Sequence, residues 1–356
     1  MKKLRIKIKP KAPFASELNS DTFFGHICWG IKYLYSEDEL TKFLKRYYEE
    51  SETKPLIISS GFPMIDDEEL YPKPVLRPLN KEEEEDCLSK YFNGEKIIFY
   101  SALKTLKKQS FISRKILEEL KNNLSYHNLY KCVFEGNYCP VNFLKKPEKC
   151  KSSKRDCSYF TKNKCDFIKS ISSESNIFHN TINRLTNTVE EKGGFYSTKN
   201  TFYEESVRIW IYIYYDDFEI EKIKEIFNFI SISGFGKDKS TGKGYFDFEI
   251  EENVIIPKSD NPDAFIVLSN YYPKKDDFQN AQYDIFTKIG KLGGDFANLK
   301  SIPHFKKPLL FIRPGSTIKP YNFKDFYGDI VRNVHTDERI IQYGITIPLF
   351  VRVLWG

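Results

Sequence analysis

The stretch SISGFGKDKSTGKGYFDFEI, residues 231–250, carries most of the information about the fold. It holds four glycines within eleven residues, interleaved with three lysines: Gly234, Gly236, Gly242 and Gly244, with Lys237, Lys239 and Lys243. A helical pattern precedes it and an alternating, strand-like pattern follows it. Both common phosphate loops are excluded. A Walker A loop has four residues between its glycines, whereas five separate Gly236 from Gly242, and the dinucleotide fingerprint needs a glycine where Lys239 stands.

The elements on either side of this glycine-rich loop complete a recurring order. In the first third of the chain, the patterns predict a strand at 4–10, a helix with Ser20 or Asp21 as its N-cap, and a strand with a turn at 55–65. Further along the chain, they predict a strand at 207–215, a helix at 219–232 and a strand at 244–252. The order strand, helix, strand, strand, helix, strand is the ferredoxin-like arrangement shared by RNA-recognition domains.

We therefore predict an α+β fold with two ferredoxin-like (RRM-like) domains. The first spans 1–252 and has a long insertion at about 121–206, which is polar, carries cysteines and is expected to be irregular. The glycine-rich loop, 234–244, is its last helix-to-strand connection. The second spans 253–356, where four segments resemble strands and helical periodicity is poor, so we interpret it as a degenerate ferredoxin-like or mostly β domain.

The charge balance is modest, but the lysines are clustered. The chain has 356 residues and a formal net charge of +6. Lysines and one arginine crowd the first strand at Lys2, Lys3, Arg5, Lys7, Lys9 and Lys11, and a lysine-rich run fills 145–169. Such clusters are typical of a polyanion partner, and equally of a solvated surface. No signal-peptide or membrane-spanning apolar segment is present, so we expect a soluble, cytoplasmic protein without a membrane partner.

The glycine-rich loop suits contact with RNA. Glycine permits positive φ and close approach of the backbone to a ligand, and successive N–H groups can form an anion nest. The lysines add charge, and Ser240 and Thr241 add hydroxyl groups. Such a surface can hold the phosphates and sugars of single-stranded RNA without reading much sequence. The alternative is an ordinary mobile connection.

Two further segments are candidates for the same surface. Residues 180–199 contain Asn183 and Arg184, whose side chains could read splayed bases. In the loop after the first strand, Phe14 could stack on a base and Ser16 could offer a hydroxyl. The alternative for 180–199 is a polar surface hairpin.

Four stretches, together with the glycine-rich loop, resemble the RAMP superfamily of CRISPR proteins. They are SDTFFGHICWG (20–30), HNTINRLTNTVEEKGGFYS (179–197), KKPLLFIRPGSTI (306–318) and QYGITIPL (342–349). The first resembles the first helix of the family's type III members, and the other three are similar to segments of the RAMP subunit that binds the 5′ tag of the guide RNA in Csm, or type III-A, complexes. The matches keep their order over most of the chain; the departure is 121–178, whose cysteines fit no family pattern.

The resemblance implies a non-catalytic scaffold that requires no cofactor. Its partners would be the 5′ tag of the guide RNA (crRNA), the large signature subunit with its polymerase-like domain, and the first backbone RAMP subunit. Two alternatives remain open. One is the equivalent subunit of a type III-B complex. The other is a metal-independent endoribonuclease that processes guide-RNA precursors, with His26 as general base.

His26 has two interpretations. Some RAMP endonucleases use a histidine near this helix as a base, and histidine can do so at neutral pH. However, His26 lies between Phe24 and Trp29 on an apolar helix, which favours a hydrogen-bonded structural residue. No lysine or tyrosine is placed to complete an acid–base pair.

Five of the seven cysteines fall within 132–165: Cys132, Cys139, Cys150, Cys157 and Cys165. No Cys-x-x-Cys spacing is present. An insertion with little apolar surface could still be stapled by a structural zinc on any four of these thiolates or, less readily, by an iron–sulfur cluster. Disulfides and free thiols are the alternatives. Cys28 and Cys87 are interpreted as isolated.

Overall fold

The fold is described from a computed structural model that covers most of the chain. The description omits residues 50–51, 136–137, 141–142, 147, 149, 151–156, 158–164, 166–169, 190–193, 299–301 and 356. Most of the lysine-rich run at 145–169 therefore lies outside the described residues. None of the described helices is both long enough and apolar enough to cross a membrane.

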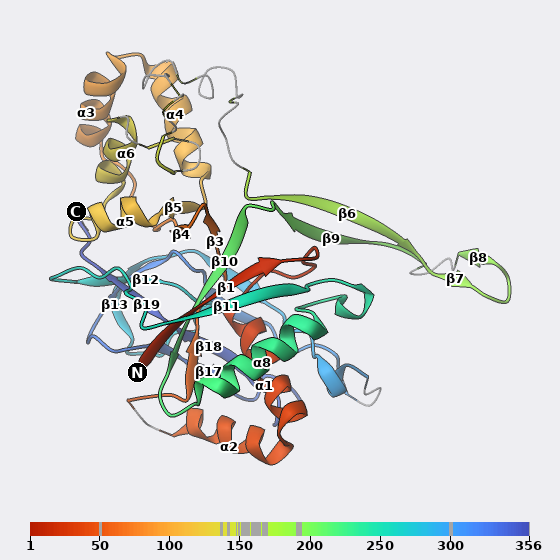
Figure 1. The fold of residues 1–356 in the computed structure, drawn as a ribbon. Coiled ribbons are helices and arrows are strands. Elements are labelled where there is room, and N and C mark those ends of the chain that lie inside the picture. Colours follow the sequence, from red (N-terminus) through yellow and green to blue (C-terminus); the bar gives the residue numbers. More distant parts are fainter. Residues whose placement is uncertain are drawn as a thin grey trace.

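A mainly antiparallel sheet forms the centre of the molecule (Figure 1). Its strand order is β11 (Phe246–Glu252), β1 (Lys2–Pro10), β10 (Val207–Tyr215), β3 (Phe62–Ile65), β4 (Glu68–Pro72) and β5 (Phe111–Ser113), and β2 (Leu56–Ile58) also pairs with β10. The alternation of β1 places Leu4, Ile6 and Ile8 on one face, each fully buried. They lie directly opposite Ile213, Ile211 and Ile209 of β10. These cross-strand pairs set the register of the sheet.

Two helices pack beside this sheet. They are α1 (Ser20–Leu34) and α8 (Ile220–Ser233), and α8 also packs on β11. The apolar stripe predicted for α8 is buried, at Ile223, Ile226, Phe227 and Ile230. The helices come close at Gly30, where an added Cβ would lie 2.9 Å from a methyl group of Ile226. A third helix, α2 (Glu37–Tyr48), packs against α1.

The start of α1 differs from the prediction by one residue. The N-cap is Asn19, and the helix begins at Ser20. Ser20 is used in tertiary contacts instead of capping: its N–H donates to Ser60 Oγ at 3.1 Å, and its Oγ accepts from the Asn270 N–H at 2.9 Å. A hydroxyl recruited from a distant segment is not visible in a local capping pattern.

The insertion expected to be irregular contains ordered elements. Helix α6 (Tyr126–Phe134) buries Leu129, Tyr130, Val133 and Phe134. It packs with α3 (Lys81–Phe92), next to α4 (Lys96–Lys108) and α5 (Arg114–Leu120). Further on, β6 (Ser172–Asn180) and β9 (Phe195–Tyr203) form a long hairpin that projects from the body, with β7 (Ile182–Asn183) and β8 (Thr188–Val189) at its tip (Figure 1). The prediction failed because the strands of the hairpin hold many polar residues, and because α6 is a short helix within a mostly polar stretch.

Residues 253–356 are rich in strands, as expected. The strands are β12 (Ala264–Val267), β13 (Phe278–Gln282), β14 (Ile285–Lys288), β15 (Leu309–Ile312), β16 (Thr317–Pro320), β17 (Tyr327–Val331), β18 (Gln342–Thr346) and β19 (Pro348–Val351). Four form a sheet in the order β13, β16, β12, β19, and β14–β15 and β17–β18 form two ribbons. Their core is continuous with that of the central sheet: the Ile58 N–H donates to Tyr343 Oη at 3.1 Å, and Tyr343 stacks on Phe24. The division at 252/253 stays a prediction.

Candidate functional site

The glycine-rich loop connects α8 to β11 (Figure 1). All four of its glycines have positive φ: Gly234 at 83°, Gly236 at 81°, Gly242 at 85° and Gly244 at 72°. Between them lies a short 3₁₀ turn, Lys239–Thr241, preceded by Asp238 at φ 59°. Positive φ costs little conformational energy at glycine and more at residues with a Cβ, which explains why this loop is rich in glycine.

Three of these glycines are also required by lack of space, and at Gly234 an added Cβ would lie 2.5 Å from the carbonyl oxygen of Lys243. An added Cβ at Gly244 would lie 2.2 Å from the carbonyl oxygen of Phe235, and one at Gly236 would lie 2.5 Å from the Ser16 Cβ. At Gly242, by contrast, no atom lies within 4 Å of that position. The two ends of the loop are therefore packed against the protein, while its middle faces open space.

A buried aromatic cluster anchors the loop. The side chain of Phe235 is fully buried, and its ring centroid lies 4.4 Å from that of Phe23, 4.9 Å from that of His26 and 6.1 Å from that of Phe14. Phe14 itself is 1% exposed and meets Tyr203 of β9 edge-on. The expectation that Phe14 stacks on a base is therefore wrong, because its ring is buried and lies against Phe235, the residue that anchors the loop.

The backbone of the loop is bonded inward. The Gly236 N–H donates to His26 Nε2 and the Lys237 N–H to Ser16 Oγ, both at 2.8 Å. The N–H groups of Phe235, Thr241, Gly242 and Gly244 also donate to backbone carbonyls. Because protein acceptors take these amides, they do not contribute to the predicted anion nest, which stays a prediction for the other amides of the loop. Ser16 likewise acts here as a hydrogen-bond acceptor for the loop.

The polar side chains of the loop, in contrast, are exposed or half-buried. Ser240 and Thr241 are exposed, as is Lys237, whose ammonium lies 4.0 Å from Asp238. Lys239 and Lys243 are half-buried, and within the described part of the chain neither has a carboxylate within 4.0 Å. The loop is thus a fixed turn that carries three ammonium groups.

The lysines of the first strand differ from those of the loop. Lys7 lies 3.2 Å from Glu251 and Lys11 lies 2.8 Å from Asp247, so part of the positive charge predicted there is neutralised by carboxylates of β11.

His26 is part of the support of the loop. Burial, with a smaller contribution from the Lys239 ammonium, lowers the pKa of His26 to about 3. The ring is therefore neutral at pH 7, and its Nε2 accepts the Gly236 N–H. The lone pair that a general base would use is already engaged in this hydrogen bond.

The predicted residues of 180–199 lie elsewhere. Asn183 and Arg184 are at the tip of the β6–β9 hairpin, away from the glycine-rich loop (Figure 1). Asn183 Oδ1 accepts the Leu185 N–H at 2.9 Å, and Arg184 is exposed. The base of the hairpin meets the loop region, where Thr201 and Phe14 exchange two backbone hydrogen bonds. The structure thus brings Phe14 and Ser16 to the glycine-rich loop but leaves Asn183 and Arg184 apart.

Sequence reasoning missed the apolar surface of this hairpin. Phe178 and Phe195 stack in parallel with centroids 5.5 Å apart, yet each is 65% exposed. At the tip, Leu185 is 95% exposed and Ile182 is 59% exposed. Apolar residues in both arms of a two-stranded hairpin, with no core to cover them, indicate a partner surface.

The five cysteines do not assemble. Cys132 donates to Glu119 at 3.8 Å, and Cys157 is buried. Among the described residues, which include all five, no three of their sulfur atoms lie within 4.8 Å of one another. The zinc hypothesis for 132–165 thus gains no support from this arrangement, since a four-thiolate site would require the segment to rearrange.

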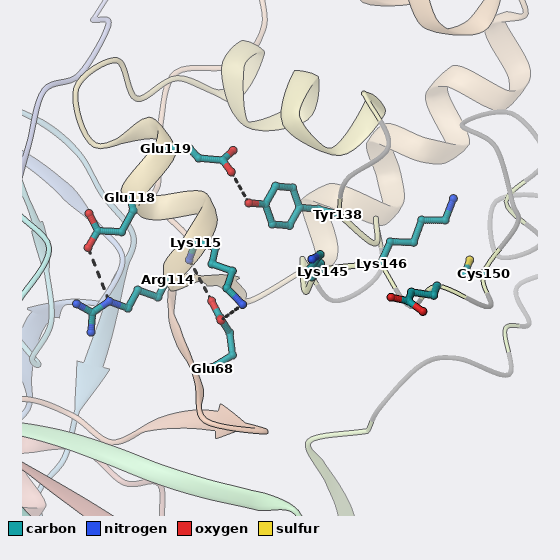
Figure 2. Close-up of a pocket in the computed structure, with 10 residues that line it drawn as sticks. Glu68, Arg114, Lys115, Glu118, Glu119, Tyr138, Lys145, Lys146 and Cys150 are labelled. Carbon is teal, nitrogen blue, oxygen red and sulfur yellow. Dashed lines mark hydrogen bonds and ion pairs between the residues drawn. The ribbon is translucent and has the colours of Figure 1, made fainter.

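A hollow of about 860 Å³ beside α5 is a second candidate (Figure 2). Its charged groups pair with one another: Lys115 with Glu68 at 2.9 Å, and Arg114 with Glu118 at 3.7 Å. The Tyr138 hydroxyl donates to Glu119 at 2.5 Å. A lining of balanced, paired charge suits a polyanion less well than the glycine-rich loop does.

Comparisons with known proteins identify the fold. No protein-family model matches the chain, and no curated protein matches it in sequence. Among solved structures, it is similar over 100% of both chains to a chain of the Csm1-Csm4 cassette in complex with AMPPNP, with 16% identity and a TM-score of 0.56. It is also similar to a chain of the Csm3-Csm4 subcomplex of the type III-A CRISPR-Cas interference complex, over 99% of both chains, with 22% identity and a TM-score of 0.57. Csm4 is named in both assemblies, and the chain shares its fold with the chains that it matches there.

Proposed function

We propose that this chain is a non-catalytic subunit of a type III-A CRISPR effector complex and that it holds the 5′ tag of the guide RNA. The observation that carries the proposal is the glycine-rich loop. It packs on the buried Phe235 ring, its amides donate to His26 and Ser16, and it carries the exposed Lys237 and the half-buried Lys239 and Lys243. A rigid turn with several ammonium groups binds phosphates without reading sequence.

The assemblies of the similar structures support the choice of partners. One of those chains was solved with Csm1 and the other with Csm3. By analogy, we propose that this chain docks a large signature subunit with a polymerase-like domain and a backbone RAMP subunit, in the cytoplasm. The exposed apolar residues of the β6–β9 hairpin are available for such contacts or for the bases of the RNA.

We also interpret residues 1–252 as a ferredoxin-like unit of RAMP type. The predicted element order is present as β1, α1, β2 with β3, β10, α8 and β11, and the first four strands of the sheet, counted from its β11 edge, run β11, β1, β10, β3. For 253–356, the strand-rich sheet supports a degenerate or mostly β version.

The absence of catalysis is part of the proposal. His26 is neutral and already accepts a hydrogen bond from Gly236, so the endoribonuclease alternative lacks its base. The purified protein should bind repeat-derived RNA in the presence of EDTA and leave it intact. Cleavage of that RNA, lost in His26→Gln, would establish the enzyme instead.

The binding test uses two variants of equal charge. Replacing Lys237, Lys239 and Lys243 with alanine should weaken binding of 5′-tagged guide RNA by the assembled complex. The slope of log affinity against log salt should fall by roughly 2, at about 0.7 per single-strand phosphate contact. The control replaces Lys104, Lys107 and Lys108, which are exposed on α4, and loses the same three charges. If both variants show the same salt slope, the loop is only a connection and the assignment of the site is wrong.

A further inference from the structure

Three side chains with metal-ligand chemistry meet between α3 and α6. They are Asp86 and Cys87 of α3 and His127 of α6, and one donor atom from each lies within 4.8 Å of the other two. His127 Nε2 is 3.1 Å from Asp86 Oδ2. No other group of three or more such residues comes together in the part of the chain that the structure describes.

The donor set favours one class of metal. A thiolate sulfur, an imidazole nitrogen and a carboxylate oxygen are the three ligand types that zinc takes in proteins. Calcium and magnesium prefer oxygen donors alone, so the sulfur argues against them. Cys87 is fully buried, whereas the Asp86 side chain is 53% exposed and that of His127 is 26% exposed. The sulfur would thus face the interior, and water could complete the coordination from the exposed side.

The two helices hold these side chains in place. Helix α3 opens with a reciprocal capping box between Asn80 and Glu83, and Arg77 holds Glu83 with contacts of 2.6 and 2.8 Å. Helix α6 is capped by Ser125, which accepts the Asn128 N–H at 3.1 Å. Each helix therefore starts at a defined residue within about two turns of the donor that it carries.

Contacts further along bring the same two helices together. The rings of Phe92 and Phe134 meet edge-on with centroids 4.9 Å apart, and the Tyr91 hydroxyl donates to Glu135 at 3.0 Å. Donors carried by packed helices are positioned better than donors on loops.

We propose that Asp86, Cys87 and His127 form a zinc-binding site that ties α3 to α6. A water molecule occupies the fourth position. The site lies in the helical group formed by α3, α4 and α6 (Figure 1), where a metal would cross-link two helices that already pack together. The site is independent of the proposed RNA-binding function and differs from the five-cysteine hypothesis.

The test is a titration of the EDTA-treated full-length protein with Co²⁺, followed by competition with Zn²⁺. The wild-type protein should bind about one Co²⁺ per chain, with a sulfur-to-cobalt charge-transfer band that Zn²⁺ abolishes. Cys87→Ser should lose this band. Asp86→Asn and His127→Gln, at partly exposed positions, should keep the fold by circular dichroism. Each of these two substitutions removes a direct metal ligand and should weaken Co²⁺ binding. Loss of an outer-shell partner already costs roughly 10–100-fold in metal affinity, so the loss here should be at least that large.

Two controls identify which thiols bind. Cys28→Ser removes an isolated half-buried thiol on α1 and should leave the band unchanged. A variant with serine at 139, 150, 157 and 165 should also retain it. Absence of the band in the wild type would overturn the proposal, as would its persistence in Cys87→Ser. Loss of the band in the 139–165 variant alone would place the metal on those cysteines instead.

Discussion

The glycine-rich loop and the tip of the β6–β9 hairpin are both turns at the surface, but they are held in different ways. The loop rests on Phe235, whose side chain is fully buried, and its amides are bonded to His26 and Ser16. The tip, residues 182–189, is held by local bonds such as that from the Leu185 N–H to Asn183, and its apolar side chains are exposed. The loop is therefore shaped by the core before any ligand binds, whereas the tip has apolar surface left for a partner to cover.

The largest difference should appear when an aromatic ring is removed from each region. Phe235→Ala should lower the free energy of unfolding by about 3–5 kcal/mol, because it empties a site enclosed by three other rings. Phe178→Ala removes one exposed stacking contact and should cost about 1 kcal/mol or less. Urea unfolding of both variants measures this. Similar losses would mean that the hairpin is as integral to the core as the loop is.

The next effect depends on pH. The pKa of His26 is lowered to about 3 in the folded protein from an ordinary value of 6.5. The unfolded chain therefore binds more protons between these values, and stability falls as the pH drops from 6.5 toward 3. The loss is at most about 1.4 kcal/mol per pH unit.

A glutamine at position 26 isolates this contribution. His26→Gln can still accept the Gly236 N–H but does not titrate. Unfolding curves at several pH values between 4 and 7 should show a shallower acid-side loss for the variant than for the wild type. If the free energy of unfolding depends on pH in the same way for both proteins, His26 is not buried as a neutral ring and does not hold the loop. The hairpin tip contains no histidine and should contribute nothing to the difference.

The smallest effect concerns backbone strain. Gly242 and Asn187 both have positive φ, at 85° and 56°, one in the loop and one at the tip. Gly242→Ala meets no steric contact but places a side chain in left-handed backbone, which should cost about 1–2 kcal/mol. Asn187→Ala adds similar local strain, but the tip can open without disturbing the core, so the global loss should stay below about 0.5 kcal/mol. Thermal unfolding of the two variants measures this difference. Equal decreases in Tm would show that the loop and the hairpin tip are coupled to the core to the same degree.

Local patterns predicted much of the central sheet. Alternation at Leu4, Ile6 and Ile8 and the helical stripe from Ile223 to Ile230 identified β1 and α8, because one buried face imposes a period of two on a strand and 3.6 on a helix. The same logic failed for the hairpin at 172–203, where neither face is covered by a continuous core. It also failed for α6, whose apolar residues lie in a short polar segment.

The sequence by itself determined that residues 234–244 form a glycine-dependent turn between a helix and a strand, with lysines along it. Positive φ is a property of single residues, so spacing and composition are enough to predict it. Only the tertiary structure decided where the amides of that turn point and which side chains meet. His26 and Ser16 reach the loop from more than two hundred positions away, and Cys87 meets His127 of another helix. Such contacts depend on how the elements pack around a shared core, and no local pattern encodes that packing.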